Sequence, residues 1–116
     1  MAETDPRLAT DLAGLRLVSP IVLAAGTAGY ADELADAFDL AAVGAVTTKS
    51  ITNEPRDGNP TWRILPTKTG MLNAIGLANP GVDRFMDEII PRIERVPTAV
   101  IGSIAGNAVD DYAAVA

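Results

Sequence analysis

Three short apolar runs without regular polar alternation mark the chain. They read PIVLAAG (residues 20–26), AVGAVTTK (residues 42–49) and PTAVIGSIAG (residues 97–106). Runs of this kind are typical of strands that are buried on both faces, as in a parallel sheet. We therefore expect three parallel strands.

Segments with apolar residues at helical spacing follow these runs. The apolar stripes are Leu34, Ala37, Phe38 and Ala41 in residues 30–44, and Val82, Phe85, Met86, Ile89 and Ile90 in residues 81–97. Such stripes predict amphipathic helices, and Pro91 is expected to kink or end the first part of the second one. Residues 107–116 predict a third helix, because Asp110 and Asp111 suit a helical first turn.

The order of these elements indicates an α/β fold with a parallel sheet and helices outside it. Residues 8–18 precede the first unit and predict a β-hairpin that turns at Ala13 and Gly14. A doubly wound sheet would carry a glycine-rich phosphate loop, but GTAGYA from Gly26 matches that fingerprint only in part, and Lys49 stands where an acid is expected. Three β/α units are too few for a complete eight-fold barrel.

Composition excludes several classes of function. The 116 residues include 9 basic and 15 acidic side chains, a net charge of -6, with no cluster of Lys and Arg. A nucleic-acid or anionic-membrane surface is therefore not expected. The sequence has no Cys and no His, so we predict no thiolate chemistry and no metal site. No apolar run reaches the ~20 residues of a membrane span, and the start lacks the pattern of a secretory signal, so a cytoplasmic location is expected.

The strand ends are the expected place for a functional site in a β/α fold. The first run ends in AAGTAG (residues 24–29), which forms either a tight turn or a flat floor where backbone approaches a planar ligand. The second ends at Lys49, either a solvated surface group or a cation that stabilises charge developing on a ligand. The third ends in GSIAG (residues 102–106), where Ser103 belongs to a structural turn or contacts a ligand.

Residues 51–79 predict a long loop without regular structure. Loops of this length are usually functional or disordered. Its apolar residues argue against disorder, and we expect them to anchor the loop to the top of the fold: Trp62, Ile64, Leu65, Met71, Leu72, Ile75 and Leu77. Within GMLNAIGLANPG (residues 70–81), the glycines allow backbone N–H groups to face a site, and Asn73 offers a donor and an acceptor to a polar ligand.

Three stretches of the chain resemble one enzyme family. PIVLAAGTAGY, GAVTTKSITNEPRDGNP and GMLNAIGLANPGVD are similar to the opening segments of dihydroorotate dehydrogenases, most closely the class 1B catalytic subunit, and the resemblance extends over residues 12–116. It implies a TIM (β/α)8 barrel with a hairpin across its bottom, FMN across its top, and oxidation of dihydroorotate to orotate in pyrimidine biosynthesis. Residues 1–116 would then form the N-terminal part of this FMN-binding domain, about three β/α units preceded by the hairpin.

The resemblance also implies roles for single residues. Ala25 lies beneath the flavin, where many relatives have Ser, and Ser103 matches a flavin contact that is often Asn. Lys49 and Ser50 contact the flavin, and Lys49 also reaches the substrate and stabilises the reduced anion. The remaining residues match the loop that grips orotate: Asn73, Ala74, Ile75, Gly76 and Leu77.

The family's catalytic base, a Cys further along the chain in class 1 enzymes, is absent from this sequence. The last predicted helix also runs to Ala116 without a cap. We therefore expect a fragment of a longer enzyme, inactive alone. Two alternatives stay open: a stand-alone α/β binding module, and a related FMN barrel enzyme acting on other pyrimidines.

Partners also follow from the resemblance. They are dihydroorotate and orotate, and an iron–sulfur/FAD electron-transfer subunit, within a homodimer core or heterotetramer. The sequence does not decide whether NAD or another oxidant accepts the electrons.

Overall fold

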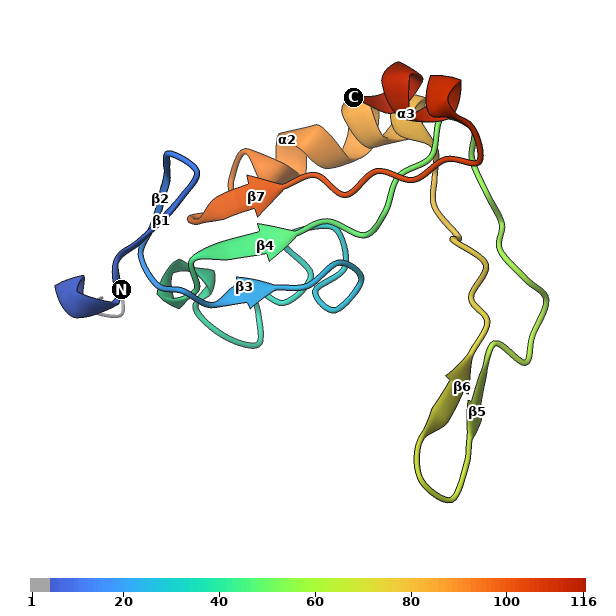
Figure 1. The fold of residues 1–116 in the computed structure, drawn as a ribbon, viewed down its shortest axis with the longest axis horizontal. Helices are drawn as coiled ribbons and strands as arrows, with labels where there is room; N and C mark the ends of the chain where they lie inside the picture. Colours follow the sequence, from blue (N-terminus) through green and yellow to red (C-terminus); the bar gives the residue numbers. More distant parts are fainter. Residues whose placement is uncertain (1–4) are drawn as a thin grey trace.

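The computed structural model describes residues 5–116 and contains a three-stranded parallel sheet at its centre (Figure 1). The strand order is β3 (Val22–Leu23), β4 (Ala45–Thr47) and β7 (Ala99–Ile101), with β4 in the middle. In this register, Val46 pairs with Leu23 on one side and with Val100 on the other. The predicted parallel sheet is confirmed, although each strand occupies only the middle of its apolar run.

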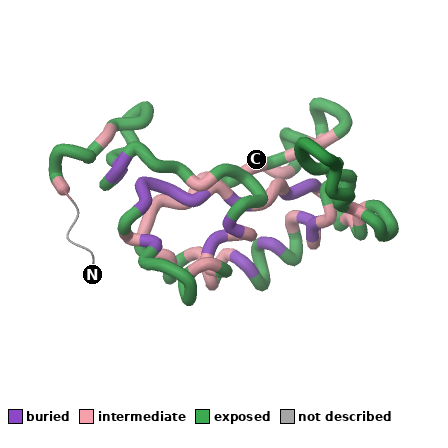
Figure 2. Tube along the Cα trace, turned by 90° about the horizontal axis from the view of Figure 1, so that it is seen from below, coloured by how far each residue is buried: buried purple, intermediate pink, exposed green. Residues whose placement is uncertain are grey.

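The core lies around the central strand. Ala45 and Val46 are fully buried, and Val46 belongs to a cluster with Ala28, Leu40 and Val43. A second cluster joins Ile51 to two helical residues, Phe85 and Ile89. Figure 2 shows the buried residues gathered in the middle of the molecule, while the projecting segments are exposed.

The predicted N-terminal hairpin is confirmed. A 3-10 helix, η1 (Pro6–Leu8), leads into β1 (Thr10–Leu12), which pairs antiparallel with β2 (Leu15–Leu17). Ala13 and Gly14 both have positive φ, 52° and 89°, as a two-residue type I′ turn requires.

The helix predicted over residues 30–44 is wrong. Residues 31–37 form turns instead, and the regular piece that follows is a 3-10 helix, η2 (Leu40–Ala42). Acidic side chains compete for the backbone here: Glu33 accepts hydrogen bonds from the N–H groups of Tyr30 and Ala31, and Asp39 accepts one from Ala41. Of the predicted apolar stripe, Leu34 packs on the core cluster, whereas Phe38 is exposed; the buried residue of this segment is Leu40, which lies outside the predicted stripe.

The second predicted helix forms with a disturbance next to Pro91. It consists of α1 (Val82–Arg84), a π-helical turn η3 (Phe85–Ile89) and α2 (Ile90–Ile93) in direct succession. Pro91 has no N–H and its ring crowds the carbonyl four residues earlier, which favours a wider turn there. The last predicted helix is confirmed as α3 (Val109–Val115), and Asp111 accepts hydrogen bonds from the N–H groups of Asn107 and Ala108 at its start.

The long loop contains a second hairpin, so the prediction of a loop without regular structure is wrong. β5 (Ile64–Pro66) pairs antiparallel with β6 (Met71–Asn73), and the hairpin projects away from the sheet (Figure 1). The predicted anchoring also fails within the described residues, because all of the predicted anchors are exposed except Ile75, which is half-buried: Trp62, Ile64, Leu65, Met71, Leu72 and Leu77. Within residues 5–116, no helix has the length and apolar character needed to cross a membrane.

Candidate functional site

An open cavity of ≈ 690 Å³ lies between the ends of β3 and β4 and the segment that follows β6. This volume falls within the ~300–1,000 Å³ that small-molecule sites usually have. The lining residues are Ala25, Gly26, Thr27, Lys49, Ser50, Asn73, Ala74, Ile75, Gly76 and Leu77. Backbone and small side chains therefore form much of this surface.

The turn after β3 forms the first part of the lining. Gly26 has φ 79°, and a Cβ atom there would meet nothing within 4 Å. The Thr27 hydroxyl donates to the carbonyl of Ala24 at 2.6 Å, and the Thr27 N–H donates to the same oxygen at 3.1 Å. These bonds fix a turn whose outer surface is open to a flat ligand.

The end of β4 contributes Lys49 and Ser50. The Lys49 N–H donates to the carbonyl of Gly29 at 2.9 Å, which ties this strand end to the turn after β3. The hydroxyls of Ser50 and Ser103 lie 2.8 Å apart and share a hydrogen bond. Lys49 makes no side-chain hydrogen bond or ion pair within the described residues, so its ammonium is available to a ligand.

Residues 73–77, the 73–77 loop, form the opposite side of the cavity. The Asn73 side-chain oxygen accepts from the Ile75 N–H at 3.0 Å, and the Ala74 N–H donates to the carbonyl of Arg63 at 2.8 Å. Asn59 holds the loop through two hydrogen bonds. Its backbone N–H donates to the Ile75 carbonyl at 3.0 Å, and its side-chain amide donates to the Ala74 carbonyl at 2.9 Å.

Two backbone donors of this loop remain unpaired within residues 5–116. Gly76 and Leu77 have positive φ values of 80° and 54°, and neither N–H donates to an acceptor in the described chain. Two neighbouring backbone N–H groups without an acceptor are free to donate to one polar ligand. The loop can therefore offer N–H donors to a carboxylate or carbonyl.

The structure brings most of the sequence-predicted site residues to one cavity. Ala25, Lys49, Ser50 and the 73–77 loop all line it, whereas Ser103 does not and is linked to it through Ser50. Sequence reasoning missed Thr27, whose hydroxyl within AAGTAG was the available signal. It also missed Asn59, which has no local signal because its partners lie far along the chain.

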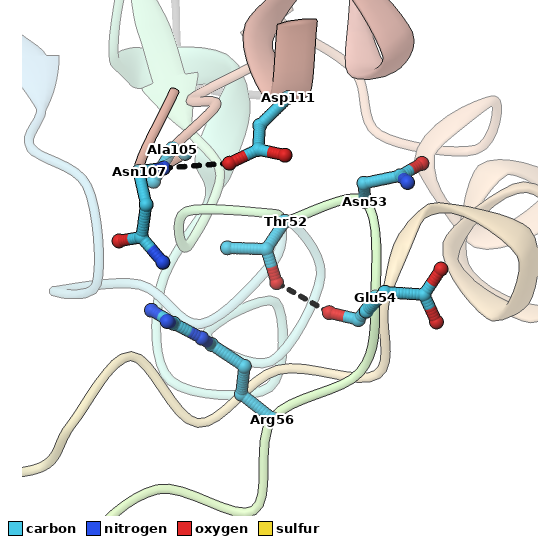
Figure 3. Close-up of a pocket in the computed structure, with 8 residues that line it drawn as sticks. Thr52, Asn53, Glu54, Arg56, Ala105, Asn107 and Asp111 are labelled. Carbon is cyan, nitrogen blue, oxygen red and sulfur yellow. Dashed lines mark hydrogen bonds between the residues drawn. The ribbon is translucent and has the colours of Figure 1, made fainter.

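A smaller cavity of ≈ 150 Å³ lies between residues 52–56 and 105–111 (Figure 3). The Thr52 hydroxyl donates to the Glu54 carbonyl at 2.6 Å, and the Asp111 carboxylate accepts from the Asn107 N–H at 2.8 Å. The N–H groups of Asn107 and Ala108 lower the pKa of Asp111. These polar groups form hydrogen bonds within the fold.

The described residues also contain no group of three or more acidic side chains that could hold a metal ion.

Comparisons with known proteins agree on one family. The sequence profile of dihydroorotate dehydrogenase matches residues 7–116. The catalytic subunit of dihydroorotate dehydrogenase B (NAD(+)) from Desulforudis audaxviator is 46% identical over 110 residues, which cover 95% of this chain and 36% of that protein. The Bacillus caldolyticus subunit of the same name is 47% identical over 110 residues, or 95% of this chain and 35% of that protein.

A solved structure gives the same result. The crystal structure of DHODH in complex with ferulenol from Eimeria tenella has a TM-score of 0.68 and 25% identity, and the match covers 97% of this chain and 33% of that chain. The chain thus spans about a third of the length of the proteins it matches. From the profile match over residues 7–116 and the shared fold, we conclude that the chain belongs to the dihydroorotate dehydrogenase family.

Proposed function

We propose that this chain supplies the flavin floor and part of the substrate site of an enzyme that oxidises dihydroorotate to orotate in pyrimidine biosynthesis. The observation that carries the proposal is that Ala25, Lys49, Ser50 and the 73–77 loop line one cavity in a member of this family. Because the chain spans about a third of its relatives, the activity belongs to a longer protein. Residues 1–116 would be the N-terminal part of its (β/α)8 barrel, about three β/α units.

The cavity fits FMN as the cofactor. The turn after β3 leaves an open surface at Gly26, where no side chain would stand between backbone and a planar ring. Ala25 would lie beneath that ring, with Ser50 and, through it, Ser103 at its edge. Bound FMN supplies an acceptor for the hydride that leaves dihydroorotate. Lys49 would hold a positive charge next to it, which stabilises negative charge as the hydride is transferred.

The 73–77 loop fits an anionic, planar substrate such as orotate. Gly76 and Leu77 provide the N–H donors that have no partner within the described chain, and these would bind the carboxylate. The Asn73 oxygen is engaged with Ile75, so its amide N–H₂ group would donate to the substrate. Ala74 and Ile75 would contact the ring.

The remaining parts of the reaction lie outside this chain. It contains no Cys, so the base that removes a proton from dihydroorotate would come from another part of the full-length enzyme. The names of the relatives include NAD(+) and a catalytic subunit, which supports NAD as the electron acceptor and a further subunit beside this one. The resemblance to the family implies that this partner would be an iron–sulfur/FAD subunit. A homodimer core or heterotetramer in the cytoplasm completes the proposal.

The test uses the full-length enzyme that contains this chain. We expect the cofactor released on denaturation to be FMN, and anaerobic dihydroorotate to bleach the flavin absorbance. Dihydrouracil serves as the comparison substrate, since it lacks the carboxylate. Bleaching by dihydrouracil but not by dihydroorotate would instead support an enzyme acting on other pyrimidines, and protein without flavin would contradict the proposal.

A further inference from the structure

Asn79 is a buried polar residue two positions after the 73–77 loop. Only 7% of the Asn79 surface is exposed. The side-chain oxygen accepts from the N–H groups of Thr52 at 3.1 Å and Gly81 at 3.0 Å. The amide nitrogen donates to the Leu77 carbonyl at 2.7 Å and to the Thr52 hydroxyl at 2.8 Å. Both the oxygen and the nitrogen of the Asn79 side-chain amide are therefore hydrogen-bonded within the fold.

The Thr52 hydroxyl is the partner that fixes this amide. A hydroxyl has one proton, and the shorter of its two possible donations is to the Glu54 carbonyl, at 2.6 Å compared with 3.2 Å to Asn79. The hydroxyl thus accepts from the Asn79 nitrogen. Because Thr52 follows the end of β4, the amide joins the segment carrying Lys49 to the 73–77 loop. Reciprocal backbone hydrogen bonds of 2.9 Å between Arg56 and Asn79 join the same two segments.

Leu77 is the loop residue whose carbonyl accepts a hydrogen bond from the Asn79 amide. Its φ of 54° is in the left-handed region, which residues with a Cβ atom rarely adopt. Such conformations persist where surrounding contacts hold them, and they cluster at ligand-binding sites. The hydrogen bond from Asn79 to the Leu77 carbonyl is a direct contact of this kind, and it orients the peptide groups around Leu77.

We propose that Asn79 is a positioning residue for the substrate. It holds Leu77 in the left-handed conformation through the Leu77 carbonyl, and Thr52 holds Asn79. The unpaired N–H groups of Gly76 and Leu77 are thereby kept in place for the carboxylate of the substrate. This inference rests on the proposed function, because it concerns how the same loop binds orotate.

The experiment compares four variants of the full-length enzyme. Asn79→Asp keeps the oxygen that accepts from Thr52 and Gly81 but sets a second oxygen against the Leu77 carbonyl. Thr52→Val removes the hydroxyl that fixes the amide, and Thr52→Ser restores it. Asn53→Asp is the matched control, because the Asn53 side chain makes no hydrogen bond within the described residues. Orotate affinity is measured from the flavin spectrum, and hydrogen exchange is measured in residues 74–78 without orotate.

We expect Asn79→Asp to weaken orotate binding about tenfold and to raise KM more than it lowers kcat, with flavin content unchanged. Exchange in residues 74–78 should become faster, and exchange in β4 should not. Thr52→Val should show the same changes to a smaller degree, and Thr52→Ser should approach the parent.

Parent-like exchange and orotate affinity in Asn79→Asp would overturn the inference. If that variant does not fold, parent-like behaviour of Thr52→Val would overturn it equally. Failure of the parent itself to bind orotate would contradict the proposed function instead, and the exchange measurement would still decide whether Asn79 orders the loop.

Discussion

Lys49 follows directly after β4 and lines the main cavity without a side-chain partner among residues 5–116. Lys49→Ala in the full-length enzyme should slow reduction of the flavin by dihydroorotate by ~10²–10³-fold, because a preorganised charge beside the reacting groups is lost. Rapid-mixing absorbance measurements under anaerobic conditions give this rate. Lys49→Arg keeps the charge and should lose less. Equal rates in the parent and in Lys49→Ala would show that Lys49 is a surface residue.

Asn73 has a different role from Lys49 because it belongs to the 73–77 loop. Asn73→Ala should weaken orotate binding by roughly 1.5–3 kcal/mol, the range for a hydrogen bond to a charged partner, and should slow turnover while flavin is retained. Titration of the flavin spectrum with orotate measures the change. Asn107→Ala is the matched control, since Asn107 is exposed and its side chain makes no hydrogen bond in the described part of the chain. Unchanged affinity in Asn73→Ala would make the loop a structural one.

The packing at the start of β4 requires a residue without a side chain at Gly44. It is buried just before β4, and a Cβ atom there would lie 2.0 Å from the carbonyl oxygen of Ser19. Because that neighbour is backbone, Gly44→Ala should lower the free energy of unfolding by about 1–3 kcal/mol, as overpacking does. Urea denaturation of the full-length enzyme measures it. Gly70→Ala is the control, because its nearest neighbour would be 4.0 Å away, and equal losses in both variants would contradict the packing argument.

An ion pair joins the turn segment before β4 to α2. Arg92 donates to both carboxylate oxygens of Asp32, one of them through Nε at 3.1 Å, and this hydrogen bonding lowers the pKa of Asp32. The stabilisation of the folded state by this ion pair is therefore complete above the pKa of Asp32 in the unfolded chain, about 3.9. It is lost as pH falls through the lower pKa of Asp32 in the folded protein. Because the pair is partly exposed, Asp32→Asn should cost only about 0.2–1 kcal/mol at pH 7.

Urea denaturation of the full-length enzyme at pH 7, 4 and 3 tests the ion pair. The difference between the parent and Asp32→Asn should be largest at pH 7 and smallest at pH 3. Asp36→Asn is the control, as Asp36 forms no ion pair within the described residues. A difference that stays constant with pH would contradict the electrostatic origin.

Local sequence patterns predicted some elements and missed others for identifiable reasons. The apolar runs predicted β3, β4 and β7 because burial on both faces requires such runs, and the Ala13–Gly14 turn predicted the first hairpin. The helix over residues 30–44 failed because Glu33 and Asp39 bond to nearby N–H groups. The β5–β6 hairpin was missed because its apolar residues face solvent and carry no core pattern.

The candidate site depended on another kind of information. The resemblance to a known family, rather than spacing, assigned roles to Ala25, Lys49 and the 73–77 loop. That these residues line one cavity is a property of the fold. Thr52 and Asn79 were missed because hydrogen bonds between residues 27 positions apart leave no local pattern.

At the scale of the molecule, the chain is more extended than a compact domain. Its radius of gyration is 16.0 Å, compared with ~13 Å for a compact domain of this length. β3 and β7 are the edges of the three-stranded sheet, and among the described residues more large apolar side chains are exposed than buried. Unpaired edges and exposed apolar surface are typical of a structure that other segments complete.

We therefore predict low stability for the 116-residue chain expressed alone. Its amide hydrogens in β3, β4 and β7 should exchange faster than the same amides in the full-length enzyme, because the sheet edges and apolar surface would be covered there. Hydrogen exchange with mass spectrometry compares the two. Strong, equal protection in the isolated chain, together with cooperative unfolding, would favour a stand-alone module.

The position of Trp62 has an optical consequence. Trp62 is the chain's single tryptophan and is 85% exposed, close to the start of β5. Indole emission moves to shorter wavelengths when water is removed from around the ring, so in this chain the emission is already that of a water-facing ring. Denaturation of the sheet would change it little. A blue shift would instead report that another surface has covered the β5–β6 hairpin, which makes Trp62 a built-in probe for assembly rather than for folding.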